Sequence, residues 1–278
     1  MGLGVYNAPS SPLVMIKIDN LEVVYPNGTR ALAPTTLSIE PGRFTVLLGS
    51  SGAGKSTLLR TFNGLVRPSA GAIAVDGLGA LRGRHTMRTH RRATGMVFQQ
   101  HQLIGRATVL RNVLTGRLGY HSGWRTLLPW PAAEKRRALD ALERVGLIEY
   151  ALRRADQLSG GQQQRVGIAR ALVQAPALIL ADEPIASLDP ATADRVLGLL
   201  HAICKADGIT AVVSLHQLEF ARRYADVIVG LAHGAVVFQG PPGKLGAAEI
   251  RKIYGTTEPA AVGGDDDIPL QPRTGTYA

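Results

Sequence analysis

Short apolar runs separated by turn signals follow an irregular lead, rich in Gly, Pro and Ser, at residues 1–13. Residues 14–18 are dominated by apolar side chains and favour a strand. Two more strand-like runs follow, the last of them at 44–48, and Pro-Asn-Gly and Pro-Gly sequences mark the turns between them. Residues 72–75 and 94–98 continue the pattern. We therefore expect the amino-terminal part of the chain to be rich in β-structure.

The spacing of the apolar residues becomes typical of helices near residue 100. Residues 109–114 and 132–145 favour helices, and the second places its apolar residues on one face. Beyond them, strands and helices alternate in the order helix 162–175, strand 177–182, helix 190–205, strand 210–215 and a hairpin at 226–238 that turns at His233-Gly234. This alternation predicts a core sheet with parallel strands and helices on both faces, into which a helical block at about 100–160 is inserted.

The charge balance is strongly positive, at +10, and suggests an anionic neighbour. Part of the excess is an arginine-rich segment at residues 82–92. No aromatic stacking residues accompany these arginines, and no nucleic-acid-binding motif is present. We therefore expect a solvated face, with anionic lipid headgroups as one neighbour, and no nucleic-acid partner.

Other features of the composition set limits on the class of protein. Cys204 is the single cysteine, which rules out an intrachain disulfide and fits a reducing compartment. No run approaches the ~18 consecutive apolar residues of a membrane span. Residues 1–12 lack the charged start and apolar core of a secretory signal. We expect a soluble subunit of 278 residues with a substantial core.

The most specific motif lies between the strand at 44–48 and a helical pattern that begins at Thr57. It fits G-x-x-x-x-G-K-[ST] and consists of Gly49, Ser50, Ser51, Gly52, Ala53, Gly54, Lys55, Ser56 and Thr57. Backbone N–H groups at a helix start, unobstructed at the glycines, can wrap a polyphosphate. Lys55 is expected to reach the β- and γ-phosphates and Ser56 to bind Mg²⁺. The motif predicts that the chain binds a nucleoside triphosphate.

An apolar run at 177–181 ends in Asp182-Glu183-Pro184. A buried parallel strand that delivers a carboxylate at its carboxyl end matches the needs of a phosphate site. We expect Asp182 to hold Mg²⁺, directly or through water. Glu183, one position further on, is the candidate base for a water that attacks the γ-phosphate.

A second anion site is predicted at Ser159, Gly160, Gly161 and Gln162, directly before a helix. A serine hydroxyl and two backbone N–H groups at a helix start attract a phosphate. A monomer with one P-loop has no evident use for this site. In a head-to-tail homodimer, each chain would close over the nucleotide held by its partner.

Taken in order, the P-loop, the Leu158–Gln162 stretch and the strand ending in Ala-Asp-Glu-Pro resemble the ATP-binding subunits of ABC transporters, from about residue 15 to 254. The resemblance implies that Tyr25 stacks on adenine. It implies that Gln99 contacts Mg²⁺ or the attacking water and reports to the membrane partner. Asp189 would belong to the D-loop, and His216 would be the switch histidine that contacts the γ-phosphate.

A finer resemblance, to the phosphonate-importer ATPases, rests on the Trp124–Trp130 segment and on Ile185-Ala186 within the stretch that follows the acidic strand end. It implies an ATPase at the cytoplasmic face of the inner membrane, peripheral to a membrane permease and served indirectly by a substrate-binding protein. Phosphite, phosphate or another small oxyanion remains the alternative substrate. An ABC ATPase outside transport is the alternative class, although one P-loop and no sustained heptads argue against it.

The expected fold is thus α/β, a P-loop NTPase of ABC type. It has a mixed core sheet with flanking helices, an antiparallel β subdomain and an inserted helical subdomain. We expect the ATP-binding domain to span residues 14–254, with a disordered lead at 1–13 and a disordered tail at 255–278.

Overall fold

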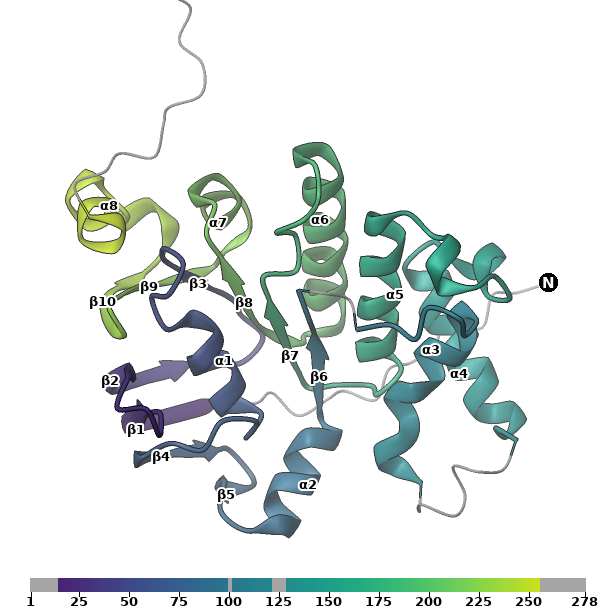
Figure 1. Ribbon diagram of the computed structural model, residues 1–278, viewed down its shortest axis with the longest axis horizontal. Coiled ribbons are helices and arrows are strands. Elements are labelled where there is room, and N and C mark those ends of the chain that lie inside the picture. Colours follow the sequence, from purple (N-terminus) through teal and green to yellow (C-terminus); the bar gives the residue numbers. More distant parts are fainter. Residues whose placement is uncertain (1–14, 100–101, 122–128, 256–278) are drawn as a thin grey trace, which may run out of the picture.

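The computed structural model describes residues 15–99, 102–121 and 129–255 of the chain. Two sheets and a block of helices make up its architecture (Figure 1). The first sheet has four strands in the order β2-β1-β4-β5, all paired antiparallel. Its strands are β1 (Ile16–Val24), β2 (Arg30–Ile39), β4 (Ala70–Val75) and β5 (Gly79–Ala80).

The second sheet forms the centre of the molecule and has the strand order β10-β9-β3-β8-β7-β6. Its members are β3 (Phe44–Leu48), β6 (Thr94–Val97), β7 (Leu178–Asp182), β8 (Thr210–Leu215), β9 (Val227–Ala232) and β10 (Ala235–Gly240). All pairs are parallel except β9 with β10, so the sheet is mixed, as expected. Every residue of β3, β7 and β8 is buried, which explains their continuous apolar runs.

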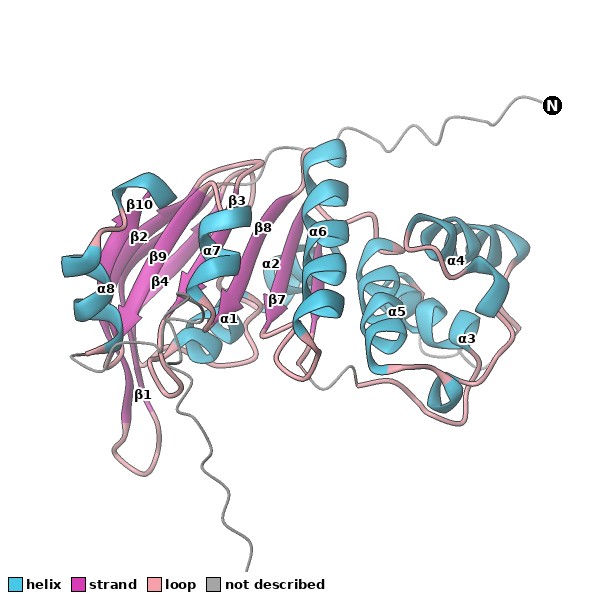
Figure 2. Ribbon diagram, turned by 90° about the horizontal axis from the view of Figure 1, so that it is seen from above, coloured by secondary structure: helices cyan, strands magenta, loops and turns pink. Residues whose placement is uncertain are grey.

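Helices cover the central sheet, and a block of further helices lies beyond one end of it (Figure 2). They are α1 (Lys55–Phe62), α2 (Arg84–Arg92), α6 (Pro190–Asp207), α7 (Leu218–Tyr224) and α8 (Ala247–Tyr254), with a 3₁₀ turn η5 (Pro242–Lys244). The helical block contains α3 (Val109–Leu114), α4 (Ala132–Arg144), α5 (Gly160–Leu172) and the 3₁₀ turns η1 (Thr115–Tyr120), η3 (Ile148–Tyr150) and η4 (Ala155–Gln157). One hydrophobic cluster joins this block to the central sheet, and a second lies beneath the antiparallel sheet.

The element boundaries differ from the sequence expectations where local chemistry intervenes. Helix α5 begins at Gly160 because Ser159 caps it, and it ends at Leu172, short of Pro176. Helix α6 continues to Asp207, where Gly208 takes a left-handed conformation with φ of 65° and ends it. The arginine-rich segment forms the helix α2, which the hydrophobic pattern did not predict because it has almost no apolar residues.

The structure describes one of the two tryptophans that end the Trp124–Trp130 segment. Trp124 lies outside the described residues. Trp130 is partly buried against the main hydrophobic cluster and makes an edge contact with His121, with ring centroids 5.5 Å apart. Within the described residues, no helix is both long and apolar enough to cross a bilayer.

Candidate nucleotide site

The P-loop joins the carboxyl end of β3 to the start of α1, as the sequence predicted. Two of its glycines are required by close backbone contacts. A Cβ at Gly49 would lie 2.5 Å from the Leu231 carbonyl oxygen, and one at Gly54 would lie 2.7 Å from that of Ala31. Gly54 also has φ of 100° and precedes α1, which begins without a side-chain cap. The uncapped helix start leaves backbone donors for an anion.

Lys55 is almost fully buried, with 3% of its surface exposed, and its ammonium group points back into the loop. Its Nζ donates to the carbonyl oxygens of Gly49 and Ser50, at 2.8 and 2.9 Å. The Glu183 carboxylate lies 3.6 Å away. Burial lowers the pKa of Lys55 from its usual value, and the Glu183 carboxylate opposes that change. The cation is thus held in place by groups that a phosphate can replace.

Asp182 ends β7 and is the centre of a hydrogen-bond network. The Ser56 hydroxyl donates to its Oδ1 at 2.7 Å, and the Ser214 hydroxyl donates to the same oxygen at 3.0 Å. The second oxygen accepts from Arg60 at 3.2 Å. With 3% of its surface exposed, the carboxylate depends on these partners. Two of the three predicted metal-binding side chains, Ser56 and Asp182, therefore meet although 126 positions separate them in the chain.

Glu183 has an unusual backbone conformation for a residue other than glycine. Its φ is 45°, in the left-handed region, which costs on the order of 1–3 kcal/mol unless the surroundings fix it. Its N–H donates to the Ser214 hydroxyl at 2.8 Å, and this bond ties the backbone to β8. The strained turn directs the carboxylate toward Lys55, while Asp182, one position earlier, faces Ser56.

The residues assigned by resemblance lie around this centre. The Tyr25 hydroxyl is 3.2 Å from that of Thr57, so the predicted adenine contact lies beside the P-loop helix. Gln99 is exposed just after β6, and His216 is exposed just after β8. The carboxyl ends of the parallel strands therefore place Gln99, Glu183 and His216 along one edge of the sheet.

Ser159 caps α5 in a capping box with Gln162: the Ser159 N–H donates to the Gln162 side chain at 2.9 Å, and the Gln162 N–H donates to the Ser159 hydroxyl at 3.4 Å. Both views show α5 in the helical block, apart from α1 (Figures 1 and 2). Within one chain the structure thus does not bring the two predicted anion sites together.

Asp189 caps α6 and accepts from the Thr192 N–H at 3.0 Å. Hydrogen bonding to Thr192, first to its side chain and second to its backbone N–H, lowers the pKa of the Asp189 carboxyl. Gly161 approaches the same turn, because a Cβ there would lie 2.4 Å from Thr192 Cγ2. Gly161 therefore packs the start of α5 closely against the first turn of α6.

Two contributors to the site were missed by sequence reasoning. Arg60 lies one helical turn after Ser56, and this spacing was a usable signal for an additional cation on the same face. Ser214 gave no usable signal, because one serine in a buried apolar strand has no distinctive pattern. Only the parallel pairing of β7 with β8, which sets Asp182 opposite Ser214, reveals its role.

A P-loop whose lysine and serine meet an Asp-Glu pair across the central strand β8, in a mixed sheet with an inserted helical block, defines an ATPase cassette. The family model described as ABC transporter matches residues 32–186. The chain belongs to the ABC transporter ATP-binding family.

Named relatives and solved structures agree with this assignment. The chain is 56% identical to the phosphite import ATP-binding protein of Stutzerimonas stutzeri, over 93% of this chain and 94% of that protein. It is 53% identical to a phosphonates import ATP-binding protein of a Nostoc species, over 92% of this chain and 97% of the relative. A dimeric ATP-binding cassette in a post-hydrolysis state, bound to ADP and phosphate, superposes with a TM-score of 0.72 at 34% identity, covering 82% of this chain and 98% of that one.

Proposed function

We propose that the chain is the ATP-hydrolysing subunit of a phosphonate-type importer, with phosphite as the alternative substrate. The observation that carries the proposal is the meeting of Lys55, Ser56, Asp182 and Glu183 where β3 and β7 end. These four side chains supply a phosphate-binding cation, two oxygen ligands and a carboxylate base. The phosphate groups of ATP would take the place of the Gly49 and Ser50 carbonyl oxygens as partners of Lys55.

Ser56 and Asp182 fit a Mg²⁺ ion. Their hydroxyl and carboxylate oxygens are hard donors, 2.7 Å apart, and Mg²⁺ in nucleotide sites binds through a few such groups and the substrate's phosphates. When bound, the ion would neutralise charge on the β- and γ-phosphates. Gln99 would approach the same region from the end of β6. Arg60 supports Asp182 from the opposite side.

Glu183 would act as the base once ATP engages Lys55. The Lys55 ammonium now lies 3.6 Å from the Glu183 carboxylate, so phosphate binding would free that carboxylate to accept a proton from water. Its strained backbone, tied to Ser214, would hold the carboxylate in position. His216, at the end of β8, would contact the γ-phosphate.

A homodimer would complete each site. Ser159, Gly160, Gly161 and Gln162 of one chain would cap the nucleotide held by the partner, with Asp189 at the dimer contact. The separation of α5 from α1 within one chain supports this arrangement, as does the capping box that already fixes the start of α5. Closure would act on the permease through Gln99 and the helical block. An external binding protein would deliver the substrate, and the chain would work at the cytoplasmic face of the membrane.

The substrate is tested by growth. Deleting the gene should abolish growth on methylphosphonate as sole phosphorus source and spare growth on phosphate. Complementation with the wild-type gene should restore growth on methylphosphonate, and complementation with the Glu183→Gln variant should not. Normal growth on methylphosphonate together with loss of growth on phosphite would retain the importer and replace the substrate.

A further inference from the structure

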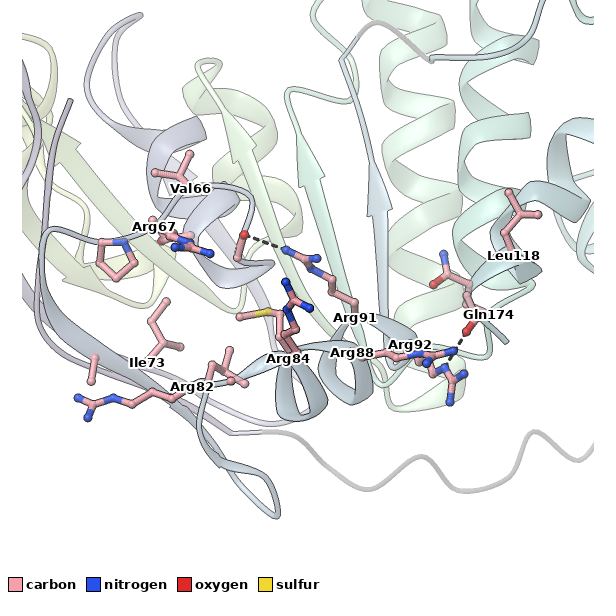
Figure 3. Close-up of a pocket in the computed structure, with 18 of the residues that line it drawn as sticks. Val66, Arg67, Ile73, Arg82, Arg84, Arg88, Arg91, Arg92, Leu118 and Gln174 are labelled. Atoms are coloured by element: carbon pink, nitrogen blue, oxygen red, sulfur yellow. Dashed lines mark hydrogen bonds between the residues drawn. The ribbon is translucent and has the colours of Figure 1, made fainter. Parts of the chain in front are cut away.

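A large cavity lies away from the P-loop, beyond the carboxyl end of α1. Its volume is about 880 Å³, and its walls come from the loop after α1, the strand β4, the helix α2 and the turn η1 (Figure 3). None of its lining residues belongs to the P-loop. A cavity of this size is in the range of small-molecule sites, which span roughly 300–1,000 Å³.

Arginine dominates the lining of this cavity, and its described walls contain no aspartate or glutamate. The arginines are Arg67, Arg82, Arg84, Arg88, Arg91 and Arg92. Figure 3 shows Arg67 on the loop after α1, Arg82 on the segment before α2 and the other four arginines on α2. The structure gives none of the six an ion pair with a carboxylate of the described residues, in contrast to Arg60, Arg117 and Arg144.

The arrangement of charge on α2 is unfavourable unless an anion is bound. Arg84 and Arg88 are one turn apart, as are Arg88 and Arg92, and like charges at this spacing destabilise a helix. The first turn holds Arg84 and no acidic residue, although the start of a helix favours negative charge. No side chain caps the helix at Gly83, which lines the cavity next to Arg84. A bound oxyanion would offset the repulsion between the arginines, supply negative charge at the start of the helix and accept hydrogen bonds from its uncapped N–H groups.

Apolar side chains form another part of the cavity wall. Val66, Ile73, Leu81, Met87 and Leu118 contribute to it. A ligand with an oxyanion head and a carbon substituent would use both walls, since a guanidinium group binds phosphate-type oxygens through paired N–H donors. We infer that this cavity is a second binding site, for a phosphonate or phosphate-monoester group, separate from the ATP site.

The cavity is connected to the ATP site through α1. Arg91 donates to the carbonyl oxygens of Asn63 and Gly64, at 2.9 and 2.8 Å, just beyond the end of that helix. The other end of α1 is Lys55 in the P-loop. Eight residues of helix span about 12 Å, which exceeds the Debye length of about 8 Å at physiological salt, so solvent ions screen much of an electrostatic effect over this distance. An anion bound beside Arg91 would lower the positive potential at the P-loop and so weaken ATP binding.

This coupling would let a phosphonate that has entered the cell slow its own import, a role that rests on the proposed function. The binding site itself does not rest on it. Coupling of this kind is reciprocal, so ATP would weaken binding of the oxyanion by the same factor.

The site is tested by calorimetric titration of the full chain with methylphosphonate, at fixed ionic strength and with ADP and Mg²⁺ saturating the P-loop. Arg84→Gln/Arg88→Gln should lower the affinity at least tenfold. Arg251→Gln/Lys252→Gln, a matched pair of exposed basic residues on α8, should leave it within twofold. Equal affinity in wild type and Arg84→Gln/Arg88→Gln, or no binding to wild type, would overturn the site.

Two further arms separate the sources of the ligand and the regulatory role. Sedimentation with vesicles of phosphatidylcholine, with and without phosphatidylglycerol, tests a lipid headgroup. Arginine-dependent binding to anionic vesicles without binding of methylphosphonate would overturn a site for the free ligand.

Saturating methylphosphonate should weaken ATP binding two- to fivefold in wild type and not in Arg84→Gln/Arg88→Gln. An unchanged wild-type ATP affinity would overturn the coupling. Since these titrations involve no transport, failure of the growth experiment would leave their outcome intact.

Discussion

The carboxylate of Glu183 lies 3.6 Å from the ammonium group of Lys55, and this contact joins the P-loop to the residue that follows β7. The two residues are 128 positions apart in the chain and meet because β3 and β7 are both neighbours of β8. The two side chains would offset each other's charge until a phosphate group binds Lys55. Because Lys55 is proposed to bind phosphate and Glu183 to accept a proton, we expect a substitution of Lys55 to affect ATP binding and a substitution of Glu183 to affect hydrolysis.

Glu183→Gln should reduce steady-state ATP turnover at least 100-fold and leave the ATP dissociation constant within about threefold, because it removes a proton acceptor and preserves shape. Lys55→Ala should instead weaken ATP binding at least tenfold, because we propose that the ammonium group contacts the phosphates. Turnover and nucleotide binding are measured in parallel, with Glu219→Gln on α7 as a matched control. Near-normal turnover in Glu183→Gln would remove this residue from the mechanism.

The separation of the two anion sites leads to a prediction about assembly. Glu183→Gln with ATP and Mg²⁺ should elute as a dimer in size-exclusion chromatography with light scattering. Adding Ser159→Arg should restore the monomer, because the side chain would enter the capping surface. Ser38→Arg, an equivalent change at an exposed position of β2, should have no effect. A trapped variant that stays monomeric at high concentration would argue that the permease is needed to bring the chains together.

The packing of Gly161 on Thr192 can be tested by stability. Gly161→Ala should lower the free energy of unfolding by about 1–3 kcal/mol, because the new Cβ would lie 2.4 Å from Thr192 Cγ2. Thr192→Ser removes that methyl group and should recover most of the loss. Gly167→Ala on the same helix meets nothing within 4 Å and should stabilise the chain by about 0.5–1 kcal/mol. Urea unfolding measures all four chains, and equal effects of the two alanines would refute the steric explanation.

His90 is expected to make the chain sensitive to mild acid. It is 2% exposed, and its Nε2 lies 2.7 Å from the Phe62 carbonyl oxygen at the end of α1. Burial lowers the pKa of His90, and the Arg91 charge adds to the effect, while the hydrogen bond to Phe62 opposes it.

A histidine with a lowered pKa in the folded state stays neutral while the unfolded chain binds a proton, so stability falls as the pH drops below about 6.5. Between pH 7.5 and 5.5, wild type should lose up to about 1 kcal/mol more than His90→Gln, which keeps a donor and does not titrate. Parallel losses in the two chains would show that His90 does not cause the acid sensitivity.

The sequence by itself determined the motifs and most of the elements. The P-loop, the Asp182-Glu183 pair and the Ser159–Gln162 stretch were identified because their chemistry depends on neighbours in the chain. The helix at 109–114 and the strand at 210–215 were predicted with the bounds that the structure has, since their apolar patterns are local. The cap at Ser159 is local in the same way, as the capping box joins residues three positions apart.

Only the tertiary structure decided which of these parts meet. The pairing of β7 with β8 makes Ser214 a partner of both Asp182 and the Glu183 backbone, and no local pattern carries that information. The same holds for α2. The sequence predicted a solvated face for its arginines, because a run of charges does not show which other segments of the chain pack beside it. The fold packs α2 against the end of α1 through His90 and Arg91, and the turn η1 of the helical block supplies a further wall of the cavity that no local pattern predicts.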